Sequence, residues 1–478
     1  MKYIPTIGLE VHAELKTKTK MFCCSKNDAD ASEPNINICP VCLAHPGTLP
    51  VINGEAVRHV LRVGLALKAR LADYTEFDRK NYFYPDLPKG YQLSQYEYPL
   101  VEGGELHGVA ITRVHLEEDT ASSIHEEGMG TVIDYNRAGV PLMELVTEPV
   151  ITSAKQAGDF ARELQLLLRY LGVSNANMEK GEMRVEANIS VSKDSARGTK
   201  VEIKNLNSFR AMERAVEYEI KRQAQLLEEG DAVVQETRGW DEAKQATFVQ
   251  RIKEGSADYR YFPDPDLPSL KLSELPEYSP ASLGKTMPEL PSERRARYLA
   301  LGVKSQDADS FVRDQELGSF FEEVITGHEA DAAWVATAGN YISNDLVSLI
   351  RDAGKRDTKT HAAIPISARN FSAIIDMLAA RKISSRVAKD ILAHVIATSE
   401  DPQEYANVNE LFQDVSAGEF EALVRATLAA NPSVVADFKG GKLASLEFLI
   451  GQAMRASKGA ADPAALRELT LKLIEEKR

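Results

Sequence analysis

The first residues that suggest chemistry lie in the stretch IGLEVHAEL (residues 7–15), where apolar and ionisable residues alternate. Successive side chains of a β-strand point to opposite faces of a sheet. The alternation therefore predicts a strand that carries Glu10, His12 and Glu14 together on one face. Two carboxylates and an imidazole on one face are suited to binding a cation, although a solvated surface strand is the simpler explanation.

Further segments combine charged residues with turn formers and apolar anchors. They are residues 77–95, 113–119, 134–149, 181–191 and 199–206. If their strands share one sheet with residues 7–15, their acidic groups converge on a hard cation such as Mg²⁺, which prefers oxygen ligands. The predicted catalytic groups are Glu10, His12, Glu118, Glu144 and Glu186.

Basic side chains in the same segments can offset the charge of a transferring phosphoryl group. The predicted substrate- and ATP-binding residues are Lys80, Asn81, Arg137, Arg184 and Lys204. The sequence contains no Walker A loop, Rossmann fingerprint or kinase glycine-rich loop, so a nucleotide site would be a nonstandard one. Charge runs usually mark solvated faces, and that explanation stays open for each segment taken alone.

All four cysteines lie within residues 23–42, as Cys23, Cys24, Cys39 and Cys42. A Cys-x-x-Cys pair turns both thiolates toward one ion, and two such pairs form a tetrahedral zinc site. The adjacent pair Cys23–Cys24 is less suitable, because neighbouring side chains of an extended chain diverge. The alternatives are four reduced thiols packed as small hydrophobic groups or a catalytic thiol. We expect structural zinc.

The pattern along the chain changes near residue 291. Before this point, short alternating strands mix with helical segments such as residues 157–173 and 208–230, which indicates an α+β domain. A segment rich in proline and serine, residues 264–295, is expected to be a linker. After it the periodicity is helical, with a second boundary near residue 403 and three short amphipathic helices beyond it. The predicted domains are residues 1–291, 292–403 and 404–478.

Composition narrows the class of protein. The 478 residues are 44% hydrophobic and 27% charged, and no apolar run approaches the roughly 20 residues that span a bilayer. The N-terminus lacks the features of a signal peptide, and the few cysteines favour reduced thiols, so we expect a cytoplasmic protein. A formal net charge of −14 argues against nonspecific nucleic-acid binding but permits a local basic patch.

Taken together, the motifs resemble the B subunits of the heterotrimeric tRNA-dependent amidotransferase, GatCAB. The resemblance rests on long, ordered segments, among them IGLEVHAELKTKTKMF, CPVCLAHPGTLPVIN, FDRKNYFYPDLPKGYQLSQY, RVHLEEDTAS, DYNRAGVPLMELVTEP, KVEIKNLNSFRAMERAVEYE, DYRYFPDPDLP and GQAMRASKGAADP. These segments span nearly the whole chain. The resemblance implies a mixed-sheet catalytic cradle domain, an all-helical domain and a small helical tail domain.

The resemblance also implies a reaction. The carboxylate of glutamate on misacylated tRNA(Gln), or of aspartate on misacylated tRNA(Asn), is phosphorylated by ATP. Ammonia, which the amidase or A subunit releases from glutamine, then displaces the phosphate, and the small C subunit holds the two larger subunits together. By resemblance, Glu10, His12 and Glu118 hold Mg²⁺, whereas Glu14 has no such support. Zinc at the four cysteines is implied to be structural.

This chain departs from the family pattern at two places. The family motif usually reads Arg-Cys-Asp-Ala-Asn, whereas this chain has Glu186 in place of the aspartate, which lengthens the reach of that carboxylate. Many family members also carry Cys-x-Cys where this chain has Cys23 and Cys24 in sequence. In the tail, the resemblance makes a basic patch a contact for the body of tRNA. Its residues are Lys439, Lys442, Arg455 and Lys458.

Other functions remain open from the sequence. The cysteine cluster and the basic tail are also compatible with a noncatalytic tRNA-binding or assembly protein stabilised by zinc. The carboxylates alone are compatible with a metal-dependent phosphohydrolase that acts without partners. ATP hydrolysis in the presence of misacylated tRNA separates these alternatives.

Overall fold

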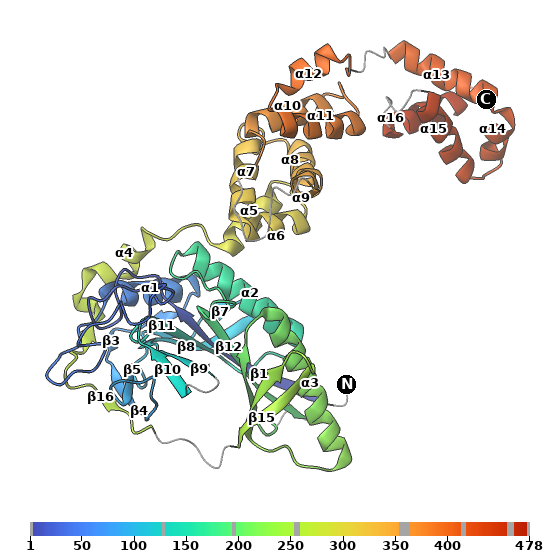
Figure 1. Cartoon of the computed structure of the whole chain (residues 1–478). Helices are drawn as coiled ribbons and strands as arrows, with labels where there is room; N and C mark the ends of the chain where they lie inside the picture. The colour runs from blue at the N-terminus through green and yellow to red at the C-terminus, as the bar shows by residue number, and fades with distance from the viewer. Residues whose placement is uncertain are drawn as a thin grey trace. The chain divides into compact units, whose positions relative to one another are not determined.

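The computed structural model describes residues 3–126, 130–193, 197–252, 259–352, 364–412, 417–456 and 463–475. The chain forms two compact units, residues 1–291 and 292–478. The first contains a mixed sheet with covering helices, and the second is helical (Figure 1). The predicted α+β class is confirmed. The further division of the second unit at residue 403 stays a prediction.

A ten-stranded sheet forms the centre of the first unit, with β1 (Ile4–Glu14) in its interior. Its strand order is β15-β14-β13-β12-β1-β11-β8-β6-β2, and β7 pairs with β8. The pairs are antiparallel except for β13 with β14, which is parallel. The other strands are β2 (Arg70–Leu71), β6 (Val101–Glu102), β7 (Glu105–Leu106), β8 (Val109–Glu118), β11 (Pro141–Thr147), β12 (Met183–Ser192), β13 (Val201–Leu206), β14 (Glu236–Asp241) and β15 (Ala246–Ile252).

Three small sheets accompany the large one. A three-stranded sheet has the order β16-β4-β5, and two-stranded sheets join β9 with β10 and β3 with β17. Their strands are β3 (Tyr74–Thr75), β4 (Asp78–Asn81), β5 (Tyr91–Ser94), β9 (Ser122–Glu126), β10 (Gly130–Asp134), β16 (Phe262–Pro263) and β17 (Leu270–Lys271). The sheet of β16, β4 and β5 therefore joins segments about 180 residues apart in sequence.

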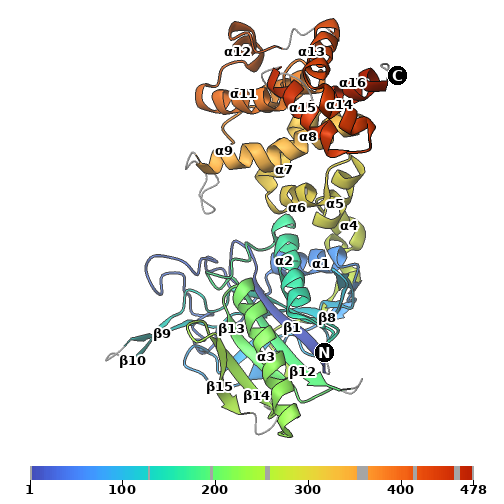
Figure 2. The same ribbon diagram turned by 90° about the vertical axis from the view of Figure 1, so that its right-hand side faces the viewer.

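The apolar side chains of β1 explain how the two faces of the large sheet differ. Leu9, Val11 and Ala13 are buried in the main hydrophobic core. Helices α1 (Gly54–Ala66), α2 (Ala154–Tyr170) and α3 (Phe209–Glu229) contribute to the same core, and α2 and α3 lie side by side against the sheet (Figure 2). Because side chains alternate along each strand, the ionisable residues of β1 face away from this core.

Capping residues mark the ends of the two longest helices. The hydroxyl groups of Ser153 and Ser208 accept hydrogen bonds from backbone N–H groups in the first turns of α2 and α3. Gly230 ends α3 in a left-handed conformation at φ 89°, which glycine adopts without steric cost.

The segment predicted as a linker is not an extended connection. It contains β17, the 3-10 helices η1 (Leu272–Glu274) and η2 (Pro276–Tyr278), and α4 (Pro280–Gly284). Leu267, Leu272 and Leu283 are buried in the main core. Proline and serine set turns here, but the leucines between them attach the segment to the first unit.

The second unit contains the remaining helices. They are α5 (Pro291–Ala300), α6 (Ser305–Arg313), α7 (Gln315–Ile325), α8 (Ala332–Asn340), the π-helix η3 (Tyr341–Leu346), α9 (Val347–Asp352), α10 (Ala368–Ala379), α11 (Ser385–Thr398), α12 (Pro402–Val408), α13 (Ala417–Ala430), α14 (Pro432–Lys439), α15 (Ala444–Ala456) and α16 (Pro463–Glu475). Helices α13 to α16 share a core of their own. We predicted three helices at this end, and α14 is the one that the sequence analysis missed. Across the described segments, we find no helix with the length and apolar character needed to cross a membrane.

Candidate active site

Strand pairing brings the ionisable residues of β1 next to those of its two neighbours. His12 lies opposite Glu144 of β11 and opposite Arg184 of β12. Glu10 lies opposite Glu186 of β12. Directly opposed residues on one face of a sheet are close enough for their side chains to interact. The register therefore assembles four of the predicted acidic and imidazole groups across three strands.

The first group of ligand atoms surrounds Glu144. Its Oε2 lies 3.3 Å from His12 Nε2 and 3.5 Å from His115 Nε2. Glu117 Oε1 lies 3.6 Å from the same nitrogen, His12 Nε2. His115, Glu117 and Glu144 are buried. Two imidazoles and two carboxylates thus share one part of the sheet that is largely shielded from solvent.

Burial and mutual attraction shift the pKa values of these groups in different directions. Burial lowers the pKa of His12, but the hydrogen bond and negative charge of Glu144 outweigh it and raise the value to about 9. Burial raises the pKa of Glu117 to about 7, with the charge of Glu144 adding to the effect. Burial also opposes ionisation of Glu144, but His115 and His12 outweigh it and lower its pKa. Glu144 is therefore the carboxylate held ionised by its neighbours.

A second group continues from Glu10 toward β13. The carboxylates of Glu10, Glu186 and Glu202 each place an oxygen within 4.8 Å of the others. Lys204 Nζ lies 2.8 Å from Glu186 Oε2, and Thr237 Oγ1 donates a hydrogen bond to Glu202 Oε2 at 2.8 Å. Burial, followed by the charges of Glu144 and Glu186, raises the pKa of Glu10. Lys204 Nζ also lies 3.8 Å from Glu202 Oε1, and its charge acts on Glu10.

The donor set fits a hard divalent cation. Ligand atoms of Glu10, His12 and Glu144 lie within 4.8 Å of one another, as do those of His115, Glu117 and Glu144. Burial, with the charge of Glu144 adding to it, raises the pKa values of Glu10 and Glu117, so burial and repulsion both oppose their ionised forms. A bound cation relieves this repulsion, and Mg²⁺ accepts carboxylate ligands while retaining water and phosphate oxygens.

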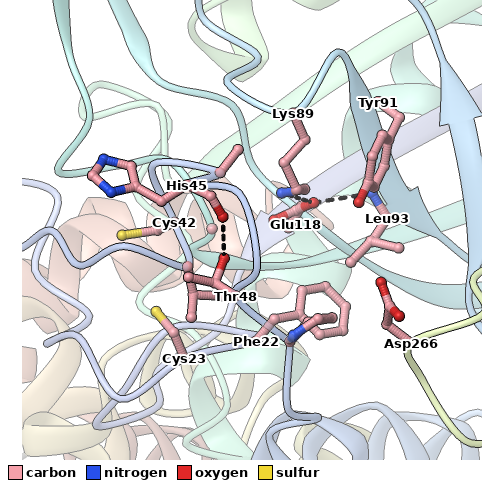
Figure 3. Close-up of a pocket in the computed structure, with 14 residues that line it drawn as sticks. Phe22, Cys23, Cys42, His45, Thr48, Lys89, Tyr91, Leu93, Glu118 and Asp266 are labelled. Carbon is pink, nitrogen blue, oxygen red and sulfur yellow. Dashed lines mark hydrogen bonds and ion pairs between the residues drawn. The ribbon is translucent and has the colours of Figure 1, made fainter.

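Glu118 lies apart from Glu10 and His12, which it was expected to join. Its carboxylate accepts a hydrogen bond from the Leu93 N–H at 3.0 Å and lies 2.6 Å from Lys89 Nζ. Figure 3 shows this contact inside a cavity of about 170 Å³ that Cys23 and Cys42 also line. The alternation of β8 explains the difference, because adjacent residues point to opposite faces. Glu117, one position earlier, faces His12 instead.

Lys80 lies beside the acidic group, whereas Asn81 has structural contacts. The positive charge of Lys80 acts on both Glu117 and Glu144 and favours their ionised forms. The side-chain amide of Asn81 donates hydrogen bonds to the backbone carbonyls of Arg79, Tyr259 and Arg260. Asn81 thus joins β4 to the segment before β16, and its amide is already engaged by the backbone.

Two predicted arginines meet at Asp119. An Nη atom of Arg184 lies 2.7 Å from Asp119 Oδ2, and Arg137 Nε lies 3.8 Å from the same oxygen. Arg137 also donates hydrogen bonds to the carbonyls of Thr120 and Ala121. Burial opposes ionisation of Asp119, but the two arginines outweigh it and lower its pKa. Arg184 lies opposite His12 on the sheet and thus connects this part of the sheet to the turn after β8. Arg137 holds that turn through its hydrogen bonds to the backbone.

Comparisons with known proteins identify the family of this chain. Residues 5–276 match the family model described as the GatB/GatE catalytic domain, and residues 319–474 match the one described as the GatB domain. The chain belongs to the GatB family. It is 44% identical to the B subunit of the aspartyl/glutamyl-tRNA(Asn/Gln) amidotransferase of Herpetosiphon aurantiacus, over 98% of both chains. It is 40% identical to the protein of the same name from Carboxydothermus hydrogenoformans, again over 98% of both chains.

The cysteines lie within the part of the chain that matches the GatB/GatE catalytic domain. Sulfur atoms of Cys23, Cys39 and Cys42 lie within 4.8 Å of one another, and Cys24 is exposed. A hydrogen bond from Cys23 lowers the pKa of Cys42 to about 4, so one thiol of the group ionises readily. Lys20 is fully buried nearby, and its charge favours the thiolate of Cys42. Three sulfurs around one point fit zinc, which binds thiolates.

The predicted tRNA-binding residues lie in the part that matches the GatB domain. Lys439 ends α14, Lys442 follows it, and Arg455 lies in the last turn of α15, all three exposed. Lys442 Nζ lies 3.1 Å from Asp437. Lys458 lies outside the residues that the structure describes.

The structure adds residues that the sequence analysis did not assign to the site. His115 and Glu117 alternate along β8 with the buried apolar residues Val114 and Leu116. This alternation is the sequence signal that places both residues on the face of the sheet that carries His12 and Glu144. Glu202 alternates in the same way between buried neighbours of β13. Lys89 had no such signal, because its contact with Glu118 depends on the loop that precedes β5.

Proposed function

We propose that this chain is the aminoacyl-tRNA kinase and transamidase component of a tRNA-dependent amidotransferase. Its substrates are glutamate on misacylated tRNA(Gln), aspartate on misacylated tRNA(Asn), or both. The observation that carries the proposal is the cluster of Glu10, His12, Glu117 and Glu144 on one sheet face, in a chain that belongs to the GatB family over nearly its full length.

The proposed reaction has two steps. A carboxylate oxygen of the aminoacyl group attacks the γ-phosphorus of ATP, so that an acyl phosphate forms and ADP leaves. Ammonia then attacks the acyl carbon, loses a proton, and expels phosphate to leave an amide. Phosphorylation is needed because a carboxylate is a poor electrophile, and the phosphate provides a leaving group. ATP-dependent C–N ligation follows from these two steps.

The residues of the sheet face have separate roles in this scheme. Glu10, His12 and Glu144 would hold Mg²⁺, with Glu186 and Glu202 beside them. The ion, when bound, stabilises the charge on the phosphoryl oxygens. Lys80 and Lys204 bring positive charge to the same acidic groups and are suited to contact ATP phosphates. Arg184, opposite His12, orients that edge of the site.

The second step needs a source of ammonia outside this chain, whose sequence contains no Ser-Ser-Lys amidase signature. The proposed enzyme is completed by an amidase, the A subunit, which hydrolyses glutamine, and by a small C subunit that joins the two larger ones. We assign zinc at Cys23, Cys39 and Cys42 a structural role, since these thiolates lie apart from the acidic cluster that would receive the phosphoryl group.

The test uses the complex of this chain with its A and C partners. We expect ATP-dependent amide formation on misacylated tRNA, and a loss of at least about 100-fold in Glu10→Gln and Glu144→Gln, because each removes a ligand charge. Glu217→Gln on the exposed surface of α3 is the matched control and should keep full activity. Tight tRNA binding without ADP release would instead support the noncatalytic alternative, and full activity of both site variants would overturn the residue assignment.

A further inference from the structure

An uninterrupted group of aromatic rings lies next to the acidic cluster and has no part in the scheme above. We call it the aromatic platform, and its members are Tyr82, Tyr84, Tyr96, Tyr259 and Tyr261. The rings come from the segment after β4, the segment after β5 and the segment before β16. Figure 1 shows these three strands beside one another in the first unit.

The rings of the platform contact one another in series. Tyr96 and Tyr261 are stacked, with centroids 4.2 Å apart and planes 10° from parallel. Tyr261 meets Tyr259 edge to face at 6.1 Å, and Tyr259 meets Tyr82 in the same way at 5.9 Å. Tyr84 completes the series at 6.0 Å from Tyr82. Such contacts hold the rings of the platform against one another.

Two members of the platform expose most of their surface. Tyr84 is 60% exposed and Tyr96 is 61% exposed, and Phe83 between the first two tyrosines is 88% exposed. Large aromatic side chains gathered in one exposed patch mark a binding surface. The backbone beneath them is fixed, because Asn81 joins β4 to residues 259 and 260. The platform is therefore a surface that presents aromatic side chains to solvent.

The platform is continuous with the acidic cluster. Lys80 Nζ lies 5.1 Å from the centroid of Tyr259, and its charge acts on Glu117 and Glu144. Tyr82 Oη donates a hydrogen bond to Gln92, whose amide donates one to the carbonyl of Glu118. A molecule stacked on the platform thus has an ammonium group and the acidic cluster directly beside it.

We propose that the aromatic platform stacks the unpaired 3′-terminal bases of the tRNA substrate and so delivers the attached amino acid to the acidic cluster. This inference rests on the proposed function. Aromatic faces bind single-stranded bases without regard to sequence, and a nearby lysine contacts the backbone phosphates. The open exposure of Tyr84 and Tyr96 suits a polynucleotide end, whereas a free nucleotide is usually enclosed in a pocket.

The experiment measures binding of two tRNAs to the complete complex without ATP. One ends in the usual CCA sequence, and the other lacks the terminal adenosine. With the natural chain, removal of the adenosine should weaken binding about tenfold, because one stacked base is lost. With Tyr84→Ala/Tyr96→Ala, binding of the intact tRNA should weaken by a similar factor, and removal of the adenosine should then have little further effect.

Three controls make the result specific. Tyr84→Phe/Tyr96→Phe keeps the rings and should bind like the natural chain. Tyr74→Ala removes an exposed ring of a separate pair, Tyr74 with Tyr98, and should have no effect. The KM for ATP should be unchanged in all variants. A raised KM for ATP with normal tRNA binding would assign the platform to the adenine of ATP and overturn the proposal. The proposal would also be overturned if removal of the adenosine weakened tRNA binding by the alanine variant as much as it weakens binding by the natural chain.

The design also separates this proposal from the proposed function. If the natural complex forms amide on misacylated tRNA but the alanine variant discriminates the two tRNAs as the natural chain does, only the platform proposal fails. If the natural complex forms no amide at all, the proposed function fails, and the binding comparison still reports on the platform.

Discussion

His12 and His115 contact the same carboxylate, Glu144, yet their pKa values move apart. Burial lowers the pKa of His115 to about 4. The negative charge of Glu144 opposes this shift, whereas the positive charges of Arg113 and His12 add to it. His12 instead lies between Glu144 and Glu117 and keeps a raised pKa. One neutral and one charged imidazole therefore flank Glu144 in the protein without a metal. Metal binding displaces the proton from His12, so metal affinity should rise with pH.

Glu14, which the resemblance does not support as a ligand, is half-buried near Asp119. Burial, followed by the charge of Asp119, raises its pKa to about 8 from a usual 4.5. Between these two values the native state binds more protons at this position than the unfolded state does. Stability therefore falls as pH rises through this window, because ionisation is easier after unfolding.

We predict that Glu14→Gln raises the melting temperature at pH 8 and changes it little at pH 5. Glutamine keeps the shape of the side chain and cannot ionise, so the loss of stability with rising pH at this position disappears. Thermal unfolding of the full chain at both pH values measures the effect. An equal shift at pH 5 and pH 8 would show that the change is not caused by ionisation of Glu14.

The zinc ligands can be assigned one at a time. The structure groups the sulfurs of Cys23, Cys39 and Cys42 and leaves Cys24 exposed. We therefore predict about one zinc per chain in the natural protein and in Cys24→Ser, and loss of zinc in Cys39→Ser and Cys42→Ser. Metal analysis of each purified variant measures this directly. Loss of zinc in Cys24→Ser would restore the four-cysteine site that the sequence analysis favoured.

At the scale of strands, the alternation of side chains between the two faces of a strand predicted more of the site than the spacing of motifs did. It placed Glu10 and His12 on one face of β1, and the structure agrees. The same period in β8 separates Glu117 from Glu118, but the resemblance drew attention to Glu118. The pairing of His12 with Glu144 could not be read from the sequence, because register depends on how strands about 130 residues apart meet in the sheet. The aromatic platform likewise joins segments that the sequence keeps far apart.

Helix α3 is attached to β14 and β15 by a buried network of charges. Glu219 is fully buried, lies 2.7 Å from Arg222 and 3.7 Å from Arg238, and both arginines contact Glu236. Removing one partner of such a network leaves the opposite charge buried without compensation. The sheet edge that carries Thr237, the hydrogen-bond donor to Glu202, depends on this attachment.

We predict that Glu219→Ala lowers the free energy of unfolding by about 3 kcal/mol. Glu217→Ala, two residues earlier on the same helix, should lower it by less than about 0.5 kcal/mol, because its pair with Lys221 is exposed. Urea denaturation of the full chain measures both. Equal effects of the two substitutions would mean that the network contributes no more than a surface ion pair.

At the scale of the whole molecule, the net charge of −14 must be reconciled with a polyanionic substrate. The charge of the whole chain does not determine binding when contacts are local, since folded RNA is recognised by shape at a few positions. Lys439, Lys442 and Arg455 are exposed on or beside two helices of the C-terminal group, which has a core of its own. A basic patch on such a group can contact tRNA locally, whatever the net charge of the whole chain.

We predict that replacing Lys439, Lys442 and Arg455 together by alanine weakens tRNA binding by the complete complex about tenfold at roughly 0.1 M salt. Each lost phosphate contact also removes between about 0.7 and 0.9 from the slope of log affinity against log salt, so the slope should fall by about 2. Alanine at Lys155, Lys221 and Lys244, which each pair with an acidic neighbour in the first unit, changes the net charge equally and should leave the slope unchanged. If both triple variants lower affinity and slope alike, the effect belongs to the charge of the whole molecule and the tail has no specific contact with tRNA.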